Sequence, residues 1–273
     1  MDLSVVIVNY GQVGLVKQCL KGIRNAGWQF YFEVFVVMNG PDDGCAQMVS
    51  QEFPRVKTLH TKGTIGLGEA NNMGIKSSIG KHILILNPDV AIESRVIENM
   101  IDYLDNNLEV GLVAPKLLNP DQSLQHSTYR FPNLFTPLYR RTWLGKTKAG
   151  RKGLASYLMT DWDHGANRSV DWLLGACLLI RRQDLNQVGD FDKRFKLYFE
   201  DVDLCRRFWE QNKKVVYLAD INLVHYHHRE SAKWSLLRSL FSRVTWLHLA
   251  SAVKYFWKYR GKSARQAASP PVI

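Results

Sequence analysis

Short apolar runs alternate with amphipathic stretches over the first 115 residues of the chain. Continuous apolar runs predict strands at residues 3–8, 34–37, 56–59, 82–86 and 111–114. Apolar residues recurring every three or four positions predict helices at 13–25, 46–52, 69–78 and 94–106. Strands that are apolar throughout and alternate with helices are typical of a mostly parallel sheet covered on both faces. The pattern therefore predicts an α/β fold.

The rhythm changes after residue 115. Residues 119–168 are rich in Pro, Gly, Asn and basic side chains and show no clean period, so we expect a long irregular segment there. The remaining expected elements are a buried strand at 170–180 bent at Gly175, a helix from Glu200 to about 212, short strands at 215–218 and 221–224, and a helix at 234–259 before a frayed tail.

Composition limits the class of protein. The hydrophobic fraction of 46% supports a folded core, and no apolar run approaches the ~18–20 residues of a membrane-spanning helix. No basic region precedes the first apolar run, so we expect no signal peptide. The cysteines are widely spaced and form no C-x-x-C pair, which argues against a zinc site and a disulfide framework. This spacing fits a protein of the reducing cytoplasm.

The formal net charge of +11 is unevenly distributed. Residues 139–152 and 229–265 are strongly basic, and Glu230 is the one acid in these two stretches. Nucleic acid, an anionic membrane surface and a phosphorylated substrate are candidate partners, and a merely solvated basic face is the alternative. No zinc pattern, aromatic-basic RNA motif or obvious recognition helix is present, so we expect no nucleic-acid partner.

Three carboxylates crowd together at Glu200, Asp201 and Asp203, directly after Tyr198 and Phe199. Like charges at this spacing repel, which indicates a nearby cation or a group that gives up a proton. The alternative is that they are first-turn acids favoured by the helix dipole. The residues alone leave the two interpretations even.

Polar residues also follow the predicted strands. Asn9 and Tyr10 follow the first strand, Asn39 follows the second, and Asn87 and Asp89 follow the fourth. Ligands of open α/β sheets bind beyond these carboxyl ends. Ordinary turn chemistry is the alternative, and it is stronger for Asn39 than for Asp89.

Two further motifs are less specific. The glycine-rich loop at residues 62–74 matches neither the dinucleotide fingerprint nor a phosphate-binding P-loop. The histidines at 225, 227 and 228 could bind metal, although alternation along an extended segment lets at most two face the same way.

In order and spacing, these residues resemble glycosyltransferase family 2, the inverting GT-A enzymes, and most closely its rhamnosyltransferase-like bacterial members. The resemblance covers about residues 3–231 and is carried by residues 5–10, 66–74, 86–89, 171–176, 189–192 and 198–206 together with His225. It implies a GT-A fold with a mostly parallel central sheet flanked by helices. The catalytic domain would be residues 1–230, with a nucleotide-sugar half at 1–115 and an acceptor half at 116–230. A basic amphipathic helical extension would follow at 231–273.

The resemblance also implies roles for single residues. Asp89, with His225 as a further ligand, would hold a divalent cation (Mg²⁺ or Mn²⁺) on the donor diphosphate. Asp201 would be the catalytic base, and Glu200 would orient the acceptor. The remaining expected contacts are Asn9, Tyr10, Asn39, Asn72 and Asn87 on the donor side, and Trp172, Gly175 and Ala176 on the acceptor side.

One position departs from the family pattern. Family members usually have an acid at the end of the second strand that reads the nucleobase imide, and Met38 stands there in this chain. Methionine is a weak acceptor, so Asp42 or Asp43 of the same loop would have to substitute.

The expected reaction is transfer of L-rhamnose from dTDP-rhamnose to a lipid-linked oligosaccharide or growing cell-surface polysaccharide. UDP-hexose and UDP-galactofuranose are alternative donors. A binding module without catalysis would not need Asp89, Glu200 and Asp201 together.

The expected location is cytoplasmic, peripheral on the inner face of the membrane. The last predicted helix carries the interfacial residues Trp234, Trp246, Tyr255, Trp257 and Tyr259. Contact with an anionic membrane and packing on the catalytic domain both fit this helix.

Overall fold

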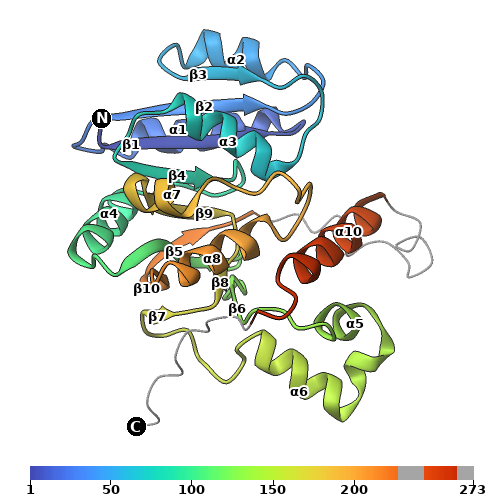
Figure 1. The fold of residues 1–273 in the computed structure, drawn as a ribbon. Helices are drawn as coiled ribbons and strands as arrows, with labels where there is room; N and C mark the ends of the chain where they lie inside the picture. Colours follow the sequence, from blue (N-terminus) through green and yellow to red (C-terminus); the bar gives the residue numbers. More distant parts are fainter. Residues whose placement is uncertain (227–242, 263–273) are drawn as a thin grey trace.

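The computed structural model describes residues 1–226 and 243–262, and its core is a twisted sheet (Figure 1). In this part of the chain the eight-stranded sheet has the order β3-β2-β1-β4-β9-β5-β10-β7. Its strands are β1 (Leu3–Asn9), β2 (Phe32–Met38), β3 (Lys57–His60), β4 (His82–Leu86), β5 (Val110–Leu118), β7 (Arg168–Ser169), β9 (Cys177–Arg181) and β10 (Lys214–Val224). β7 and β9 pair antiparallel and the other pairs are parallel, so the predicted mostly parallel sheet is confirmed.

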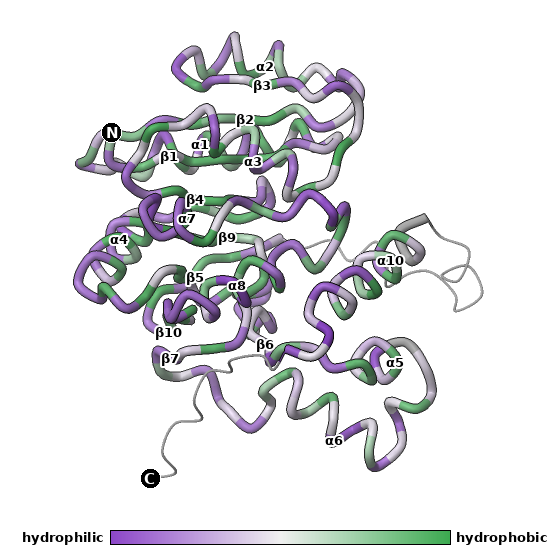
Figure 2. The backbone as a smooth tube through the Cα atoms, viewed as in Figure 1, coloured by the Kyte–Doolittle hydropathy of each residue, from purple (hydrophilic) through white to green (hydrophobic). Residues whose placement is uncertain are grey.

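Helices cover both faces of the sheet. One face packs against α1 (Val13–Asn25), α2 (Cys45–Glu52) and α4 (Val96–Asn106). The other packs against α3 (Leu67–Ser77), α7 (Arg182–Val188) and α8 (Glu200–Glu210), and α10 (Arg243–Lys258) packs against α8. β1 is apolar on both faces because Val5 and Ile7 face the core on the α1 side, whereas Val6 and Val8 face the core on the α3 side. Figure 2 shows the resulting band of hydrophobic residues along β1, β2 and β4.

The expected irregular segment at residues 119–168 contains helical structure. Its elements are α5 (Thr136–Arg141), the 3₁₀ helix η1 (Trp143–Lys146) and α6 (Lys148–Tyr157). A Cβ at Gly145 would lie 2.1 Å from the Tyr139 carbonyl oxygen, and one at Gly150 would lie 2.0 Å from that of Leu144. The glycines that resembled loop punctuation therefore let the three short helices pack closely, and they hide the helical period in the sequence.

The expected strand at residues 170–180 is two strands. β8 (Trp172–Leu173) pairs with β6 (Thr128–Tyr129) in a small separate sheet, while β9 enters the central sheet between β4 and β5. The predicted bend at Gly175 is thus a break, which the continuous apolar run conceals. Two other differences are α7, which was not predicted, and β10, which joins the two short predicted strands through a register shift between Leu218 and Asn222.

The C-terminal helix α10 packs against α8 and the loop that precedes it. Ser251, Tyr255 and Tyr259 are buried, whereas Trp246 and Trp257 on the other side are exposed. His227, His228 and Trp234 lie outside the described residues, so the expectations that rest on them stay predictions, as does the division into domains. No helix within residues 1–226 and 243–262 is both long enough and apolar enough to span a bilayer.

Candidate active site

The strand order reverses between β1 and β4, which places the site. β1 leads to β2 on one side, and the chain returns after β3 to place β4 on the other side of β1. Such a switch point opens a crevice beyond the carboxyl ends of the strands. Asn9 ends β1, and Asn87 and Asp89 follow β4 directly.

Asp89 and His225 meet at this edge. The Asp89 Oδ1 and His225 Nε2 atoms are 3.1 Å apart, and the Tyr226 N–H donates to the Asp89 carbonyl at 2.8 Å. His225 arrives there because its own N–H donates to the Leu118 carbonyl at the end of β5. Both side chains are largely buried, with 15% of Asp89 and 2% of His225 exposed.

Gln125 fixes the orientation of the His225 ring. Its amide oxygen lies 2.6 Å from His225 Nδ1, and an amide oxygen only accepts, so the ring proton sits on Nδ1. The Nε2 atom faces the Asp89 carboxylate, so both groups can turn oxygen or nitrogen lone pairs toward a common cation.

The Asp89–His225 pair fits a divalent cation. Two ligands in neighbouring positions of an octahedral ion with ~2.1 Å bonds are about 3 Å apart, which matches the observed 3.1 Å. A ring N–H held by a second residue is the usual arrangement around a metal-binding histidine. Within the described part of the chain no cluster of three or more His, Cys, Asp and Glu side chains could hold a metal.

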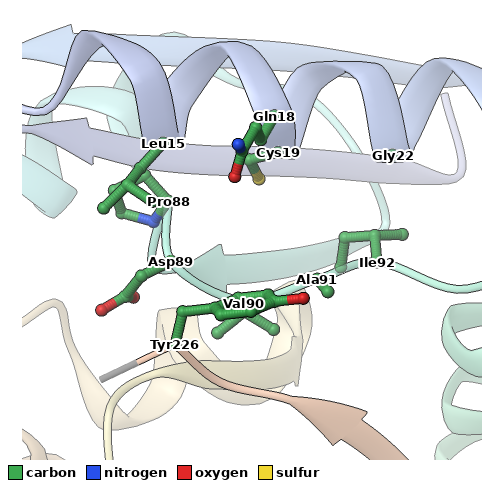
Figure 3. A pocket seen from close by; sticks show the side chains of 10 residues that line it. All are labelled: Leu15, Gln18, Cys19, Gly22, Pro88, Asp89, Val90, Ala91, Ile92 and Tyr226. Atoms are coloured by element: carbon green, nitrogen blue, oxygen red, sulfur yellow. The ribbon is translucent and has the colours of Figure 1, made fainter. Parts of the chain in front are cut away.

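A pocket of about 190 Å³ lies beside this pair (Figure 3). Its walls are Leu15, Gln18, Cys19 and Gly22 of α1, the segment from Pro88 to Ile92, and Tyr226. In Figure 3 the Asp89 carboxylate points away from Gln18 and Cys19. The pocket therefore borders the back of the Asp89 loop, on the α1 side of the segment.

Asp201 approaches the same edge from the start of α8. The Gly175 N–H donates to Asp201 Oδ2 at 3.2 Å, and the Val202 N–H donates to Oδ1 at 2.8 Å. The neighbouring Ala176 carbonyl accepts from the Asn87 N–H at 2.8 Å. The turn before β9 thus connects Asp201 to the residues that follow β4.

Glu200 is buried beside Asp201 without a partner for one oxygen. Its Oε2 makes no hydrogen bond among the described residues, and a Cβ at Gly68 of α3 would lie 3.3 Å from Glu200 Cβ. Burial raises the pKa of both carboxyl groups. The rise is larger for Glu200, where the Asp201 charge adds to burial, because the Val202 and Gly175 N–H groups stabilise ionised Asp201.

The third acid of the motif has a different place. Asp203 is fully buried and bonds to Arg207 of its own helix and to Lys258 and Tyr259 on the C-terminal side. These partners neutralise its charge, so the three-acid motif divides into the Glu200–Asp201 pair at the site and one acid behind it.

The expected donor-side amides are engaged with the protein itself. Asn39 pairs with both backbone groups of Ile65, and Asn72 pairs with both backbone groups of Phe191. The Asn9 Nδ2 group donates to Asp43 at 2.8 Å. Asn9 and Asn39 thus hold the loops that follow β1 and β2, and Asn72 joins α3 to the segment after α7.

Tyr10 and Trp172 differ in accessibility. Tyr10 is exposed, and its ring lies 3.5 Å from where a Cβ at Gly40 would be. Trp172 is buried and stacks on Tyr129 with ring centroids 4.3 Å apart. The structure therefore brings Asn9, Asn87, Asp89, Gly175 and His225 to one edge of the sheet, whereas Trp172 lies in the small β6–β8 sheet.

Gln125 is the site residue that the sequence analysis missed. It lies in the segment without a clean period, and nothing near it in the sequence indicates contact with His225, 100 positions away. Asp43 was one of two alternatives, and its bond to Asn9 brings it to the end of β1.

A mostly parallel sheet with this switch point fits the GT-A fold, and a solved structure supports that fold. GalNAc-T7, solved with UDP, GalNAc and Mn²⁺, superposes with a TM-score of 0.66 at 14% identity. The match covers 94% of this chain and 49% of that one, so this chain spans about half of GalNAc-T7.

The chain belongs to glycosyl transferase family 2, whose sequence model matches residues 4–165. N-acetylglucosaminyl-diphospho-decaprenol L-rhamnosyltransferase of Mycobacterium tuberculosis is 27% identical over 248 residues, 82% of this chain and 76% of that protein. Rhamnosyltransferase WbbL of Escherichia coli K12 is 24% identical over 270 residues, 96% of this chain and 95% of that protein. The family resemblance and the enzyme class expected from the sequence are confirmed.

Proposed function

We propose that this glycosyltransferase transfers a sugar from a nucleoside diphosphate to an acceptor hydroxyl with inversion. One observation carries the proposal: in the turn before β9, the Gly175 N–H donates to Asp201 and the Ala176 carbonyl accepts from the Asn87 N–H. A base and a donor-phosphate site in one reaction must face the same reacting carbon, and this turn connects the two groups.

Asp201 is the base in this proposal. As the acceptor oxygen bonds to the anomeric carbon, the bond from that carbon to the diphosphate oxygen breaks and the hydroxyl proton moves to Asp201. The two N–H groups at Asp201 favour its ionised form, as a base requires. Glu200, whose pKa is raised further, would keep its proton at neutral pH and orient the acceptor through Oε2.

Asp89 and His225 would hold a divalent cation against the donor diphosphate. When bound, the cation supplies positive charge that stabilises the leaving nucleoside diphosphate. Gln125 would keep the His225 Nε2 lone pair turned toward the ion. The Mn²⁺ in the GalNAc-T7 structure supports a divalent ion on this fold.

We assign the nucleoside to the ends of β1 and β2. Exposed Tyr10 and the Asn87 side chain would contact the donor directly. Asn9, Asn39 and Asn72 would act by holding the surrounding loops, since their amides are engaged there. Asp43 would read the nucleobase in place of Met38, because a carboxylate that accepts from Asn9 and from the Cys45 N–H keeps lone pairs for a third donor.

The donor we propose is dTDP-rhamnose, on the strength of the two rhamnosyltransferase relatives. UDP-hexose and UDP-galactofuranose donors remain the alternatives. The acceptor would be a lipid-linked oligosaccharide on the cytoplasmic side of the membrane, in keeping with the diphospho-decaprenol of the first relative's name. Trp172, Gly175 and Ala176 would shape the acceptor side.

Peripheral membrane contact would use the outer side of α10. Trp246, Val253 and Trp257 are exposed there, spaced seven and four residues apart on one helical side. Residues 243–262 contain basic side chains and no acid, which suits anionic lipid.

A panel of nucleotide sugars tests the proposal. With Mn²⁺ and a synthetic lipid diphosphate acceptor, we expect transfer from dTDP-rhamnose and at least tenfold less from UDP-glucose and UDP-galactofuranose. Equal or better transfer from a UDP-sugar would overturn the donor assignment, and no transfer from any donor would overturn the acceptor class.

A further inference from the structure

We propose that α10 positions the catalytic carboxylates, with Asp203 as the positioning residue through which it acts. The inference rests on the proposed role of Glu200 and Asp201. It gives the third acid of the motif and the C-terminal helix a part in the reaction, separate from any contact of α10 with lipid.

Asp203 is the centre of a buried polar cluster. Its Oδ1 accepts from Lys258 Nζ at 2.5 Å and from the Tyr259 hydroxyl at 2.8 Å, and its Oδ2 accepts from Arg207 Nε at 2.8 Å. None of the Asp203 side chain and 19% of Lys258 is exposed. A buried carboxylate needs such partners, so Asp203 ties α8 firmly to α10.

Arg206 makes a second connection between the same helices. Its guanidinium carbon lies 3.7 Å from the centroid of the Tyr259 ring, and its Nη2 donates to the Lys262 carbonyl at 3.0 Å. The Arg206 Nη1 donates to the Tyr255 hydroxyl at 3.3 Å. The C-terminal end of α10 is thus bound to the helix that begins with the catalytic pair.

The loop that enters α8 is held by α10 along its length. Lys258 pairs with Asp192 at 2.9 Å, Lys254 donates to the Arg194 carbonyl at 3.1 Å, and Ser251 donates to the Leu197 carbonyl at 2.9 Å. These three α10 residues lie on successive turns of the helix. They therefore set the path of residues 192–197 just before the carboxylates.

The last two residues of that loop have an unusual backbone. Tyr198 and Phe199 have φ values of 62° and 68°, which residues other than glycine seldom adopt. Such a conformation persists where surrounding contacts hold it. The rings of both residues pack near His248, with centroids 4.7 and 5.6 Å from it, so α10 supplies those contacts.

The opposite side of the loop is bounded by α3. A Cβ at Gly66 would lie 2.9 Å from Lys196 Cα, and the Leu67 N–H donates to the Lys196 carbonyl. The loop and the first turn of α8 are thus confined between α3, on the donor side, and α10. Loosening α10 frees one side of this arrangement and lets Glu200 and Asp201 move away from Gly175.

Lys258→Met tests the inference, because it keeps the side-chain stem and removes the charge that Asp203 faces. We expect kcat for sugar transfer to fall at least fivefold while KM for the donor changes less than twofold. Amide hydrogen exchange in residues 195–203 should accelerate at least tenfold. Lys258→Arg should recover at least half of the lost kcat.

Lys17→Met is the matched control. Lys17 also pairs with a carboxylate at 2.5 Å, that of Glu52, but on the exposed surface between α1 and α2. Lys17→Met should change neither kcat for sugar transfer nor amide hydrogen exchange in residues 195–203.

A fall in kcat of less than fivefold, or unchanged exchange in residues 195–203, would overturn the inference even if Lys258→Met lowered the melting temperature. If Lys258→Met does not fold, Tyr259→Phe, which removes one hydroxyl, carries the same test with a twofold threshold for kcat and for exchange. Absence of transfer by the unaltered protein would count against the proposed function, and the exchange measurement would still test the role of α10.

Discussion

The Gly175 N–H donates to Asp201 Oδ2 at 3.2 Å, joining the turn before β9 to the first turn of α8. No side chain stands between them, and a Cβ at Gly175 would lie 3.6 Å from that oxygen. In the proposed mechanism, the absence of a side chain at Gly175 would let an acceptor hydroxyl approach Asp201 from this side.

Gly175→Ala should impair catalysis more than folding. The added methyl group would be at an ordinary contact distance from Asp201, so we expect the melting temperature to stay within ~2 °C. It would occupy the approach to Oδ2, so kcat/KM for the acceptor should fall at least tenfold. Gly14→Ala, where a Cβ meets nothing within 4 Å, is the control. Activity like that of the control would argue against an acceptor path over Gly175.

Gln125→Leu should weaken the binding of a divalent cation. Leucine cannot accept from His225 Nδ1, so the ring loses the bond that fixes its orientation. Loss of such an outer partner typically costs 10–100-fold in metal affinity. Calorimetric titration of Mn²⁺ in the presence of a nucleoside diphosphate measures it, with Gln47→Leu on the exposed side of α2 as control. An affinity within threefold of the unaltered protein would contradict this assignment of the cation site.

Glu200→Gln should make the protein relatively more stable at high pH. Burial and the Asp201 charge raise the pKa of Glu200, so the folded state holds a proton that the unfolded chain has released. The contribution of Glu200 to the free energy of unfolding is therefore fully present at pH values below the ordinary glutamate pKa, and it declines as pH rises toward the raised pKa. One unit of difference corresponds to about 1.4 kcal/mol, or roughly 3 °C in melting temperature for a chain of this size.

Thermal melts at pH 5 and pH 8 measure this effect. The melting temperature of Glu200→Gln relative to the unaltered protein should rise by at least ~3 °C between the two pH values. The exposed control Glu93→Gln should show no such change. If the melting temperature of Glu200→Gln relative to the unaltered protein is the same or lower at pH 8 than at pH 5, burial does not destabilise the charged form of Glu200.

Replacing Trp246, Val253 and Trp257 together by alanine should weaken binding to anionic vesicles. Membrane attachment of an amphipathic helix grows with its buried apolar area and with attraction to anionic lipid. We expect at least a tenfold loss in sedimentation with vesicles containing phosphatidylglycerol, and weaker binding of the unaltered protein at high salt. Tyr31→Ala, which removes an aromatic residue that is 80% exposed, is the control. Equal binding by all three proteins would exclude this side of α10 as the lipid contact.

Deletion of the whole C-terminal region would not isolate the lipid contact. Lys258 and Tyr259 of that region contact buried Asp203. In a truncated protein that carboxylate would be exposed, or buried without its partners. A loss of vesicle binding could then reflect damage to α8 rather than a lost lipid contact.

The regular α/β half of the fold was accessible from the sequence because its signals are local. β1 and β4 are continuous apolar runs, and α1 repeats its buried residues Val16, Cys19, Leu20 and Ile23 at helical spacing. Pairing is not local. The apolar run of β9 says nothing of its antiparallel position between β4 and β5, and the glycines of η1 and α6 resemble a loop although they serve close packing.

The sequence singles out the charged residues of the candidate site but not the residues that support them. Asp89 stands out because a carboxylate that follows an apolar strand faces the expected crevice, and the Glu200–Asp201 pair stands out because neighbouring acids repel. His225 stands out as part of a histidine cluster after a strand. Gln125 carries no such signal. Asn39 and Asn72 were expected on the donor itself, whereas their amides pair with backbone groups 26 and 119 positions away.

The most direct measurement is the NMR analysis of the anomeric configuration of the product formed by the unaltered protein and by Asp201→Asn. Our account predicts an inverted linkage, and a rate reduced by about 10²–10⁴ in the variant, the usual contribution of a general base, with binding of the nucleoside diphosphate unchanged. A retained configuration, or a variant that transfers at the rate of the unaltered protein, would contradict it.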